Sequence, residues 1–178
     1  AKIVAQGAPA LWWLGPQAQP TRLGSVLEQY GLHPAGEVPG MAIELAALGN
    51  QPALPSGLTI QKVTTPEMQA AWARTAAAGS GFSASAADAL VQLETVLSEP
   101  EYASQPRYLG LWDAMPVATS ALALDCGVAG IYAVATLPSA RGQGIGRAMT
   151  VAPLLEARKL GYRVGILQAS DMGYPLYQ

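Results

Sequence analysis

The chain has 178 residues, which is enough for one domain or for one domain and a fragment of another. Hydrophobic residues make up 51% and charged residues 12%, and this balance excludes a disordered, highly charged tail. The net charge of −2, from 10 basic and 12 acidic residues, argues against a nucleic-acid partner, because a phosphate backbone needs a basic surface. A single cysteine, Cys126, excludes an internal disulfide, and we expect no metal site and a reducing, cytoplasmic location.

Two long stretches with few charges, 3–21 and 114–140, have the length of a membrane span. Prolines interrupt both stretches, whereas a span needs a continuous apolar helix of about 20 residues. The first residues also lack the continuous apolar core of a signal peptide. We therefore expect a soluble protein without a membrane partner.

The first 50 residues predict three short elements before a turn-rich connector. These elements are a strand over 8–14, a helix over 22–30 that Thr21 caps and Gly31 ends, and a third element over 40–48. Periodicity does not decide whether that third element is a strand or a short helix. Glycine and proline then dominate 49–57, and we place a domain boundary there.

From residue 58 the pattern predicts the order β-α-α-β-β-β-α-β-α, an α/β fold with a mixed sheet and helices on its faces. The elements are strands over 58–63, 107–112, 117–124, 129–136 and 163–169, and helices over 67–78 (with Pro66 in the first turn), 85–97, 144–160 and from 171 onward. Short turns at Asp113-Ala114 and Cys126-Gly127 make the three middle strands antiparallel neighbours.

Two of these helices carry further expectations. The buried stripe of the helix over 85–97 is predicted to consist of Leu90, Leu93, Val96 and Leu97. Pro153 lies inside the helix over 144–160, where it removes a backbone hydrogen bond and is expected to produce a kink.

A glycine-rich loop joins the strand over 129–136 to the next helix. The free N–H groups and the positive dipole end of a helix N-terminus attract anions. Gly142, Gly144 and Gly146 let backbone N–H groups turn toward a ligand, because no Cβ obstructs them. Arg141 and Arg147 add charged contacts to phosphate oxygens, so the expected ligand is a phosphate or pyrophosphate.

Several interpretations of this loop compete. A P-loop needs Lys-Ser or Lys-Thr after its glycines, whereas Gly146-Arg147-Ala148 stands here. A dinucleotide fingerprint needs Gly-x-Gly-x-x-Gly, whereas these glycines are spaced Gly-x-Gly-x-Gly. The pattern Arg-x-x-Gly-x-Gly is filled by Arg141, Gly144 and Gly146. The simplest alternative is a glycine-rich turn that only caps a helix.

The Arg-x-x-Gly-x-Gly pattern resembles the acyl-CoA pyrophosphate loop of the GNAT superfamily of N-acetyltransferases. Pro138 precedes the loop, and the following helix ends in Ala157-Arg-Lys-Leu-Gly-Tyr162, as in that family. The resemblance covers about 58–178 and is most specific over 131–177.

The resemblance implies a GNAT-type fold for 58–178, with acetyl-CoA or another short acyl-CoA between its fourth and fifth strands. It implies that an amine attacks the thioester directly, that a backbone N–H near Thr136 or Leu137 polarises the carbonyl, and that Tyr177 protonates the leaving thiolate. A tyrosine that only packs at a helix end is the alternative for Tyr177. The implied acyl-CoA-binding residues are Val134, Thr136, Leu137, Arg141, Gly142, Gln143, Gly144, Ile145, Gly146, Arg147 and Ser170.

No general base is evident in the sequence. Asp125, Tyr132 and Glu44 are candidates, but each is more simply explained as a structural or surface residue. His33, before a proline in a turn, and Cys126 are expected to have no catalytic role.

The chain departs from the family pattern at both ends. It stops in the family's fourth helix, before the strands that normally follow, so we expect a truncated domain. Residues 1–48 resemble the strand–helix–strand that closes a GNAT domain, so 1–50 are interpreted as the remnant of a tandem copy. We predict that this segment packs on, or completes, the sheet that the truncated end leaves open.

Three functions therefore stay open. The first is acyl transfer from acyl-CoA to the amine of a small-molecule or peptide acceptor. The second is a non-catalytic acyl-CoA-binding or regulatory module, and the third is an interaction domain whose loop only caps a helix. A homodimer is compatible with all three, and the acceptor itself is not identified by the sequence.

Overall fold

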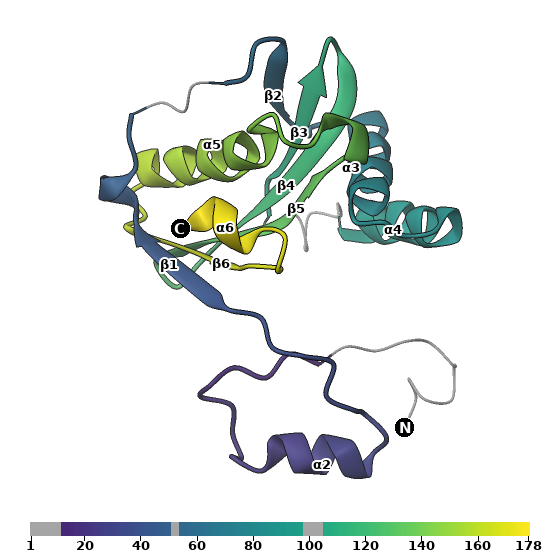
Figure 1. The fold of residues 1–178 in the computed structure, drawn as a ribbon, viewed down its shortest axis with the longest axis vertical. Helices are drawn as coiled ribbons and strands as arrows, with labels where there is room; N and C mark the ends of the chain where they lie inside the picture. Colours follow the sequence, from purple (N-terminus) through teal and green to yellow (C-terminus); the bar gives the residue numbers. More distant parts are fainter. Residues whose placement is uncertain (1–11, 51–53, 98–104) are drawn as a thin grey trace. The chain divides into compact units, whose positions relative to one another are not determined.

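A six-stranded mixed sheet in the order β1-β6-β5-β4-β3-β2 is the framework of the larger of two units in the chain (Figure 1). The computed structural model describes residues 12–50, 54–97 and 105–178. All neighbouring strands are antiparallel except β5 and β6, which are parallel. The strands are β1 (Gly40–Glu44), β2 (Leu58–Lys62), β3 (Arg107–Trp112), β4 (Met115–Asp125), β5 (Val128–Thr136) and β6 (Val164–Gln168).

The helices complete the predicted element order after residue 58. They are α3 (Pro66–Gly79), α4 (Ala84–Leu97), α5 (Ile145–Lys159) and α6 (Tyr174–Tyr177), with 3-10 turns η1 (Leu45–Ala47) and η2 (Pro138–Ala140). Thr65 caps α3, since its Oγ1 accepts a hydrogen bond of 3.3 Å from the Met68 N–H. α5 continues through Pro153 as one helix. Within the described residues, no helix has both the length and the apolar character that a membrane crossing requires.

The hairpins form where the sequence predicts them. Asp113 and Ala114 have φ of 48° and 65°, and Cys126 and Gly127 have φ of 48° and 77°. Two successive left-handed residues make a tight turn whose twist matches that of the flanking strands. β3, β4 and β5 are therefore an antiparallel meander.

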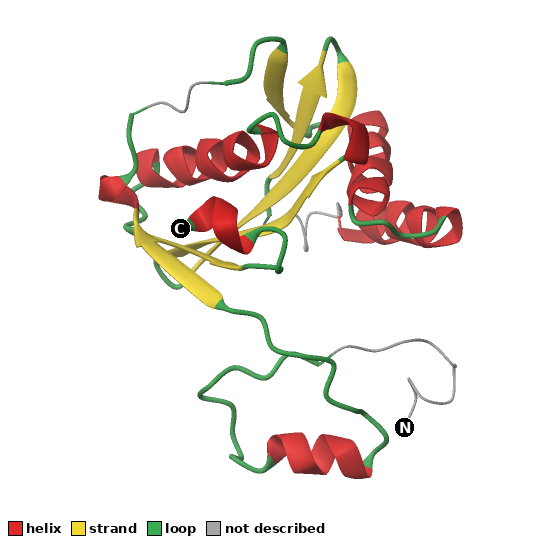
Figure 2. Ribbon diagram, viewed as in Figure 1, coloured by secondary structure: helices red, strands yellow, loops and turns green. Residues whose placement is uncertain are grey.

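Two apolar cores lie on opposite faces of the sheet, so the unit has three layers (Figure 2). α5 covers one face, where Leu122, Ile145 and Met149 are fully buried. α3 covers the other face, where Trp72 packs with Leu109 and donates a hydrogen bond of 3.0 Å to the carbonyl of Ser120, and α4 packs on α3. This arrangement confirms the expected mixed α/β fold.

The ambiguous segment over 40–48 contains both structures. Gly40–Glu44 is a strand that pairs with β6, and Leu45–Ala47 continues as a 3-10 turn with Leu45 fully buried. Arg158 of α5 holds this turn, because its Nη1 donates to the carbonyls of Leu45 (3.2 Å) and Leu48 (2.7 Å). Residues 40–44 thus add a strand to the sheet. The larger unit begins at Val38, ahead of the boundary expected at 49–57.

The smaller unit contains α2 (Leu23–Gln29), the helix expected over 22–30. Gly31 ends this helix with φ of 85°, as expected, but Arg22 is its N-cap, without a side-chain hydrogen bond, and Thr21 is not. Trp12, Trp13 and Leu14 have no regular structure, so the predicted strand over 8–14 is wrong in its described part, and its first residues lie outside the described ranges.

The buried side of α4 differs from the predicted stripe. Leu93 and Val96 are 50% and 56% exposed, and the residue of α4 that is buried is Glu94. Its carboxylate forms an ion pair with Arg107 at the start of β3, through Nε and through Nη2 at 3.1 Å. The guanidinium of Arg107 also lies over the ring of Trp72. A charge pair therefore orients α4, and two aliphatic side chains face outward.

We expect Glu94→Ala to lower the free energy of unfolding by about 3 kcal/mol, because it leaves the Arg107 charge buried without its carboxylate. Asp88→Ala is the matched control: it breaks the ion pair between Arg74 and Asp88, which is also between α3 and α4 but about 60% exposed. The control should cost less than about 1 kcal/mol. Denaturant unfolding measures both, and equal losses would contradict the role assigned to Glu94.

Candidate functional site

β5 and β6 pair along only part of their length, which leaves one edge of β5 open. The parallel pairing covers Val128–Ile131 of β5, although β5 continues to Thr136. Opposite β4, β5 has one extra residue between Tyr132 and Ala135, and Ala133 has a left-handed φ of 49°. This is a β-bulge, which bends a strand and ends its regular pairing. In the described part of the chain, no strand pairs with this edge beyond Ile131.

The backbone at the end of β5 offers one of the two expected hydrogen-bond donors. The N–H of Leu137 donates to the carbonyl of Val117 in β4 at 2.8 Å, so it is not free to polarise a thioester. Backbone groups of successive residues point to opposite sides of a strand, which places those of Thr136 on the open side. The half-buried Val134 lies within the bulge of the same edge.

The loop after β5 has the backbone geometry of an anion site. Gly142 and Gly144 have left-handed φ of 75° and 77°, and Gly144 caps α5 without any side chain. The first helical hydrogen bond runs from the Ala148 N–H to the Gly144 carbonyl at 3.1 Å, so the N–H groups of Ile145–Arg147 have no helical acceptor. Such N–H groups, at the positive end of a helix dipole, bind phosphate.

The side chains of this loop have different environments. Ile145 is 1% exposed and anchors the start of α5 in the core. Gln143 and Arg147 are exposed, and a Cβ placed on Gly142 would have no atom within 4 Å. The outer surface of the loop is therefore open to a ligand.

Arg141 binds the protein itself. Its Nε donates to the carbonyl of Thr136 at 3.1 Å, and its Nη2 donates to the carbonyl of Gly79 at 2.9 Å. Gly79 ends α3 and lies against β5: a Cβ there would be 2.9 Å from the Ala135 Cβ and 3.1 Å from the Thr136 nitrogen. No local sequence pattern points to Gly79, because its role depends on a strand far along the chain.

α6 packs beside the first turn of α5. Ser170, exposed after the end of β6, starts α6 by accepting hydrogen bonds at its carbonyl from Gly173 (2.9 Å) and Tyr174 (2.8 Å). A Cβ on Gly146 would lie 3.3 Å from Leu176. The Oη of Tyr177 lies 3.4 Å from the Oγ1 of Thr150, which places the tyrosine one helical turn from the loop.

The candidate bases lie in different places. Tyr132 is on the open part of β5, 42% exposed, with its ring close over Gly130. Asp125 is at the opposite end of β5, where its carboxylate accepts the Cys126 N–H at 2.8 Å and raises the pKa of the Cys126 thiol. Glu44 ends β1, at the start of β6. Tyr132 is thus the candidate that the fold brings to the open edge.

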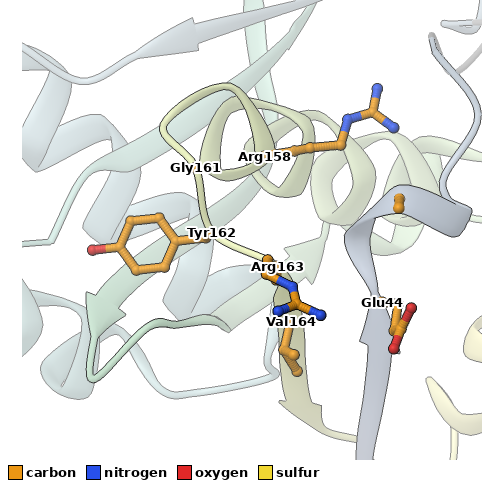
Figure 3. A pocket seen from close by; sticks show the side chains of 7 residues that line it. Glu44, Arg158, Gly161, Tyr162, Arg163 and Val164 are labelled. Atoms are coloured by element: carbon orange, nitrogen blue, oxygen red, sulfur yellow. The ribbon is translucent and has the colours of Figure 1, made fainter.

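Two surface hollows among the described residues lie away from the loop. One, of about 330 Å³, is lined by Glu44, Arg158, Tyr162 and Arg163 (Figure 3), and Arg158 there is bound to backbone carbonyls. The other, of about 360 Å³, includes Lys62 and Arg107. In the described residues no group of three or more His, Cys, Asp and Glu could hold a metal ion. The candidate site is therefore defined by a strand edge and a helix N-terminus.

Comparison with known proteins finds similarity at the level of structure. No protein-family model and no curated protein matches the chain. A GCN5-related N-acetyltransferase from Kribbella flavida is 27% identical with a TM-score of 0.61, over 88% of this chain and 59% of that one. A GCN5-related N-acetyltransferase from Sphaerobacter thermophilus is 20% identical with a TM-score of 0.62, over 85% of this chain and 48% of that one.

A third similar structure is a predicted acetyltransferase from Clostridium acetobutylicum described with acetyl-CoA. It is 18% identical with a TM-score of 0.51, over 67% of this chain and 86% of that one. The chain spans little more than half the length of the Kribbella protein, and less than half that of the Sphaerobacter protein.

We expect Gly79→Ala to lower the free energy of unfolding by about 1–3 kcal/mol, because its Cβ would contact the backbone of β5. Helix propensity alone would act in the opposite direction, by up to about 1 kcal/mol. Denaturant unfolding decides between the two, and a stabilised variant would contradict the close approach of α3 to β5.

Proposed function

Since this chain belongs to the GNAT superfamily, we propose that it is an N-acetyltransferase, which transfers an acetyl or other short acyl group from acyl-CoA to an amine. The observation that carries the proposal is the order of two features along the chain. β5 leaves β6 at Ile131, and its open edge leads directly into the uncapped, glycine-rich start of α5. A strand edge beside an anion site suits a ligand with amide groups and a pyrophosphate.

The residues of the loop and of the β5 edge suit the binding of acyl-CoA. The N–H groups of Ile145–Arg147 would hold the pyrophosphate, and the exposed Arg147 adds a charge. Gly142 and Gly144 leave the loop surface clear of side chains. The open edge of β5 from Tyr132 to Ala135 and the N–H of Thr136 would pair with the pantetheine amides, since the Thr136 carbonyl already accepts a hydrogen bond from Arg141. Acyl-CoA supplies the acyl group as a thioester, which an amine attacks directly.

In this proposal the protein orients the thioester for attack and supplies the groups that give and take protons. The backbone of Thr136 lies on the open side of β5, where its N–H would polarise the thioester carbonyl. The phenol of Tyr177 would give its proton to the leaving thiolate, and Thr150 holds that phenol in place. Tyr132 is the base candidate on the same edge. The acceptor is a small-molecule or peptide amine in this proposal.

A non-catalytic acyl-CoA-binding module is the second candidate, because no carboxylate or histidine of the sequence-derived candidates reaches the open edge. The two functions share the binding site and differ in turnover. Release of free CoA thiol in the presence of an amine panel supports the enzyme, whereas binding without release supports the module.

Gly144→Trp should abolish acetyl-CoA binding, because the indole would cover the loop surface. Gly127→Trp is the matched control: both glycines have φ of 77°, so both variants bear the same backbone strain, but Gly127 lies in the hairpin at the other end of β5. Isothermal titration calorimetry should give wild-type affinity for the control. Unchanged affinity in Gly144→Trp would refute the assignment of the loop.

Tyr177→Phe should lower kcat about 100-fold at unchanged KM for acetyl-CoA, as expected when a proton donor to the leaving group is lost. Thr150→Val is the control, because it removes the contact at the phenol and keeps the phenol itself. Steady-state kinetics with free-thiol detection should show a smaller effect for Thr150→Val. If kcat of Tyr177→Phe stays near that of the wild type, Tyr177 is not the proton donor and only packs at the helix end.

A further inference from the structure

Three segments meet at Arg141, and one of them lies 62 residues away in the sequence. They are the end of α3 at Gly79, the end of β5 at Thr136 and the cofactor loop in which Arg141 itself lies. The guanidinium donates to one carbonyl from each of the first two segments, at 2.9 and 3.1 Å. No other side-chain hydrogen bond among the described residues joins α3 to the end of β5.

α3 packs so closely on β5 that the two segments bonded to Arg141, called the clamp below, have little freedom to move relative to each other. A Cβ at Gly79 would lie 3.1 Å from the Thr136 nitrogen and 3.3 Å from the Thr136 carbonyl carbon, so backbone rests on backbone. The last carbonyls of a helix lack helical partners, and a cation at that end is also favoured by the dipole. Gly79 is such a residue, at the last position of α3.

We propose that Arg141 is a positioning residue, which fixes the cofactor loop to α3 and β5 through its two carbonyl contacts, and that its charge does not contribute to binding by contacting phosphate. Arg147 then supplies the charged side chain of the loop. The binding part of this inference rests on the proposed function, whereas the clamp itself exists without a ligand.

Two substitutions at Arg141 separate geometry from charge. In glutamine the amide Nε2 follows Cδ, as Nε does in arginine, so Arg141→Gln keeps the donor that ties the loop to the Thr136 carbonyl and removes both the charge and the donor to the Gly79 carbonyl. In lysine a methylene stands at that position, so Arg141→Lys keeps the charge and loses the forked donor set. If Arg141 holds the loop in place, Arg141→Gln should bind CoA more tightly than Arg141→Lys. If Arg141 contacts phosphate, Arg141→Lys should bind CoA more tightly.

Calorimetric titration with CoA tests this order. We expect Arg141→Gln to bind within about threefold of the wild type and Arg141→Lys to bind about tenfold more weakly, as for the loss of one charge-assisted hydrogen bond. Arg147→Gln and Arg147→Lys are the matched pair, because Arg147 is exposed on the same loop. Their order should be reversed. If Arg141→Lys binds CoA as well as or better than Arg141→Gln, the inference is overturned.

Hydrogen exchange of the ligand-free protein supplies a second readout that does not depend on CoA. The N–H groups of Ser80 and Phe82 donate to the carbonyls of Ala76 and Ala77 at 3.0 and 2.9 Å, just beyond the clamp. These amides should exchange faster in both variants, because neither side chain keeps the Nη2 donor that reaches the Gly79 carbonyl, while the β3–β4 hairpin stays protected in both. Unchanged exchange in Arg141→Lys would overturn the clamp. A wild type that binds no CoA would instead refute the proposed function, and exchange alone would then decide this inference.

Discussion

The extra residue in β5 is the constraint on which the site depends. β5 has one residue more than β4 can pair with at this point. Ala133 therefore adopts a left-handed conformation, and the strand turns away from β6. The hydroxyl of Thr119 donates to the Ala133 carbonyl at 2.9 Å, which satisfies a group that the interrupted ladder leaves without a backbone partner. Without the bulge, β6 would continue to pair along β5, and no open edge would lead to the start of α5.

Rigid packing holds this irregular strand in place from both faces. Ile145 and Met149 of α5 are buried against one face of the sheet, and the last turn of α3 lies against the backbone of Ala135 and Thr136 on the other. Alanine and glycine at these contacts allow the backbones of α3 and β5 to approach closely, because neither residue places a large side chain between them.

Local signals in the sequence predicted local structure. Pro66 marks the first turn of α3, and Cys126-Gly127 marks a hairpin, because a proline at a helix start and a left-handed turn depend on adjacent residues. The face of α4 was not predictable in this way, since Glu94 is buried only because Arg107 of another element meets it. The element order around the site was predicted correctly, whereas the ligand-binding role of the loop glycines stays a prediction. The N–H of Leu137, expected to be free, donates to the carbonyl of Val117 in β4. The interpretation of residues 1–50 as a tandem remnant stays a prediction.

The pairing of β1 with β6 has a consequence for the order of folding. Glu44 and Val164 are partners in one ladder, so the edge of the sheet joins the first strand of the unit to its last. Long closures of this kind form late and slowly, because chain entropy is lost before any contact repays it. During synthesis, β1 leaves the ribosome long before its partner exists, and Ile43 and Leu45 have no sheet to cover until then. Among the described strands of the sheet, the one that completes it therefore also waits longest for its partner.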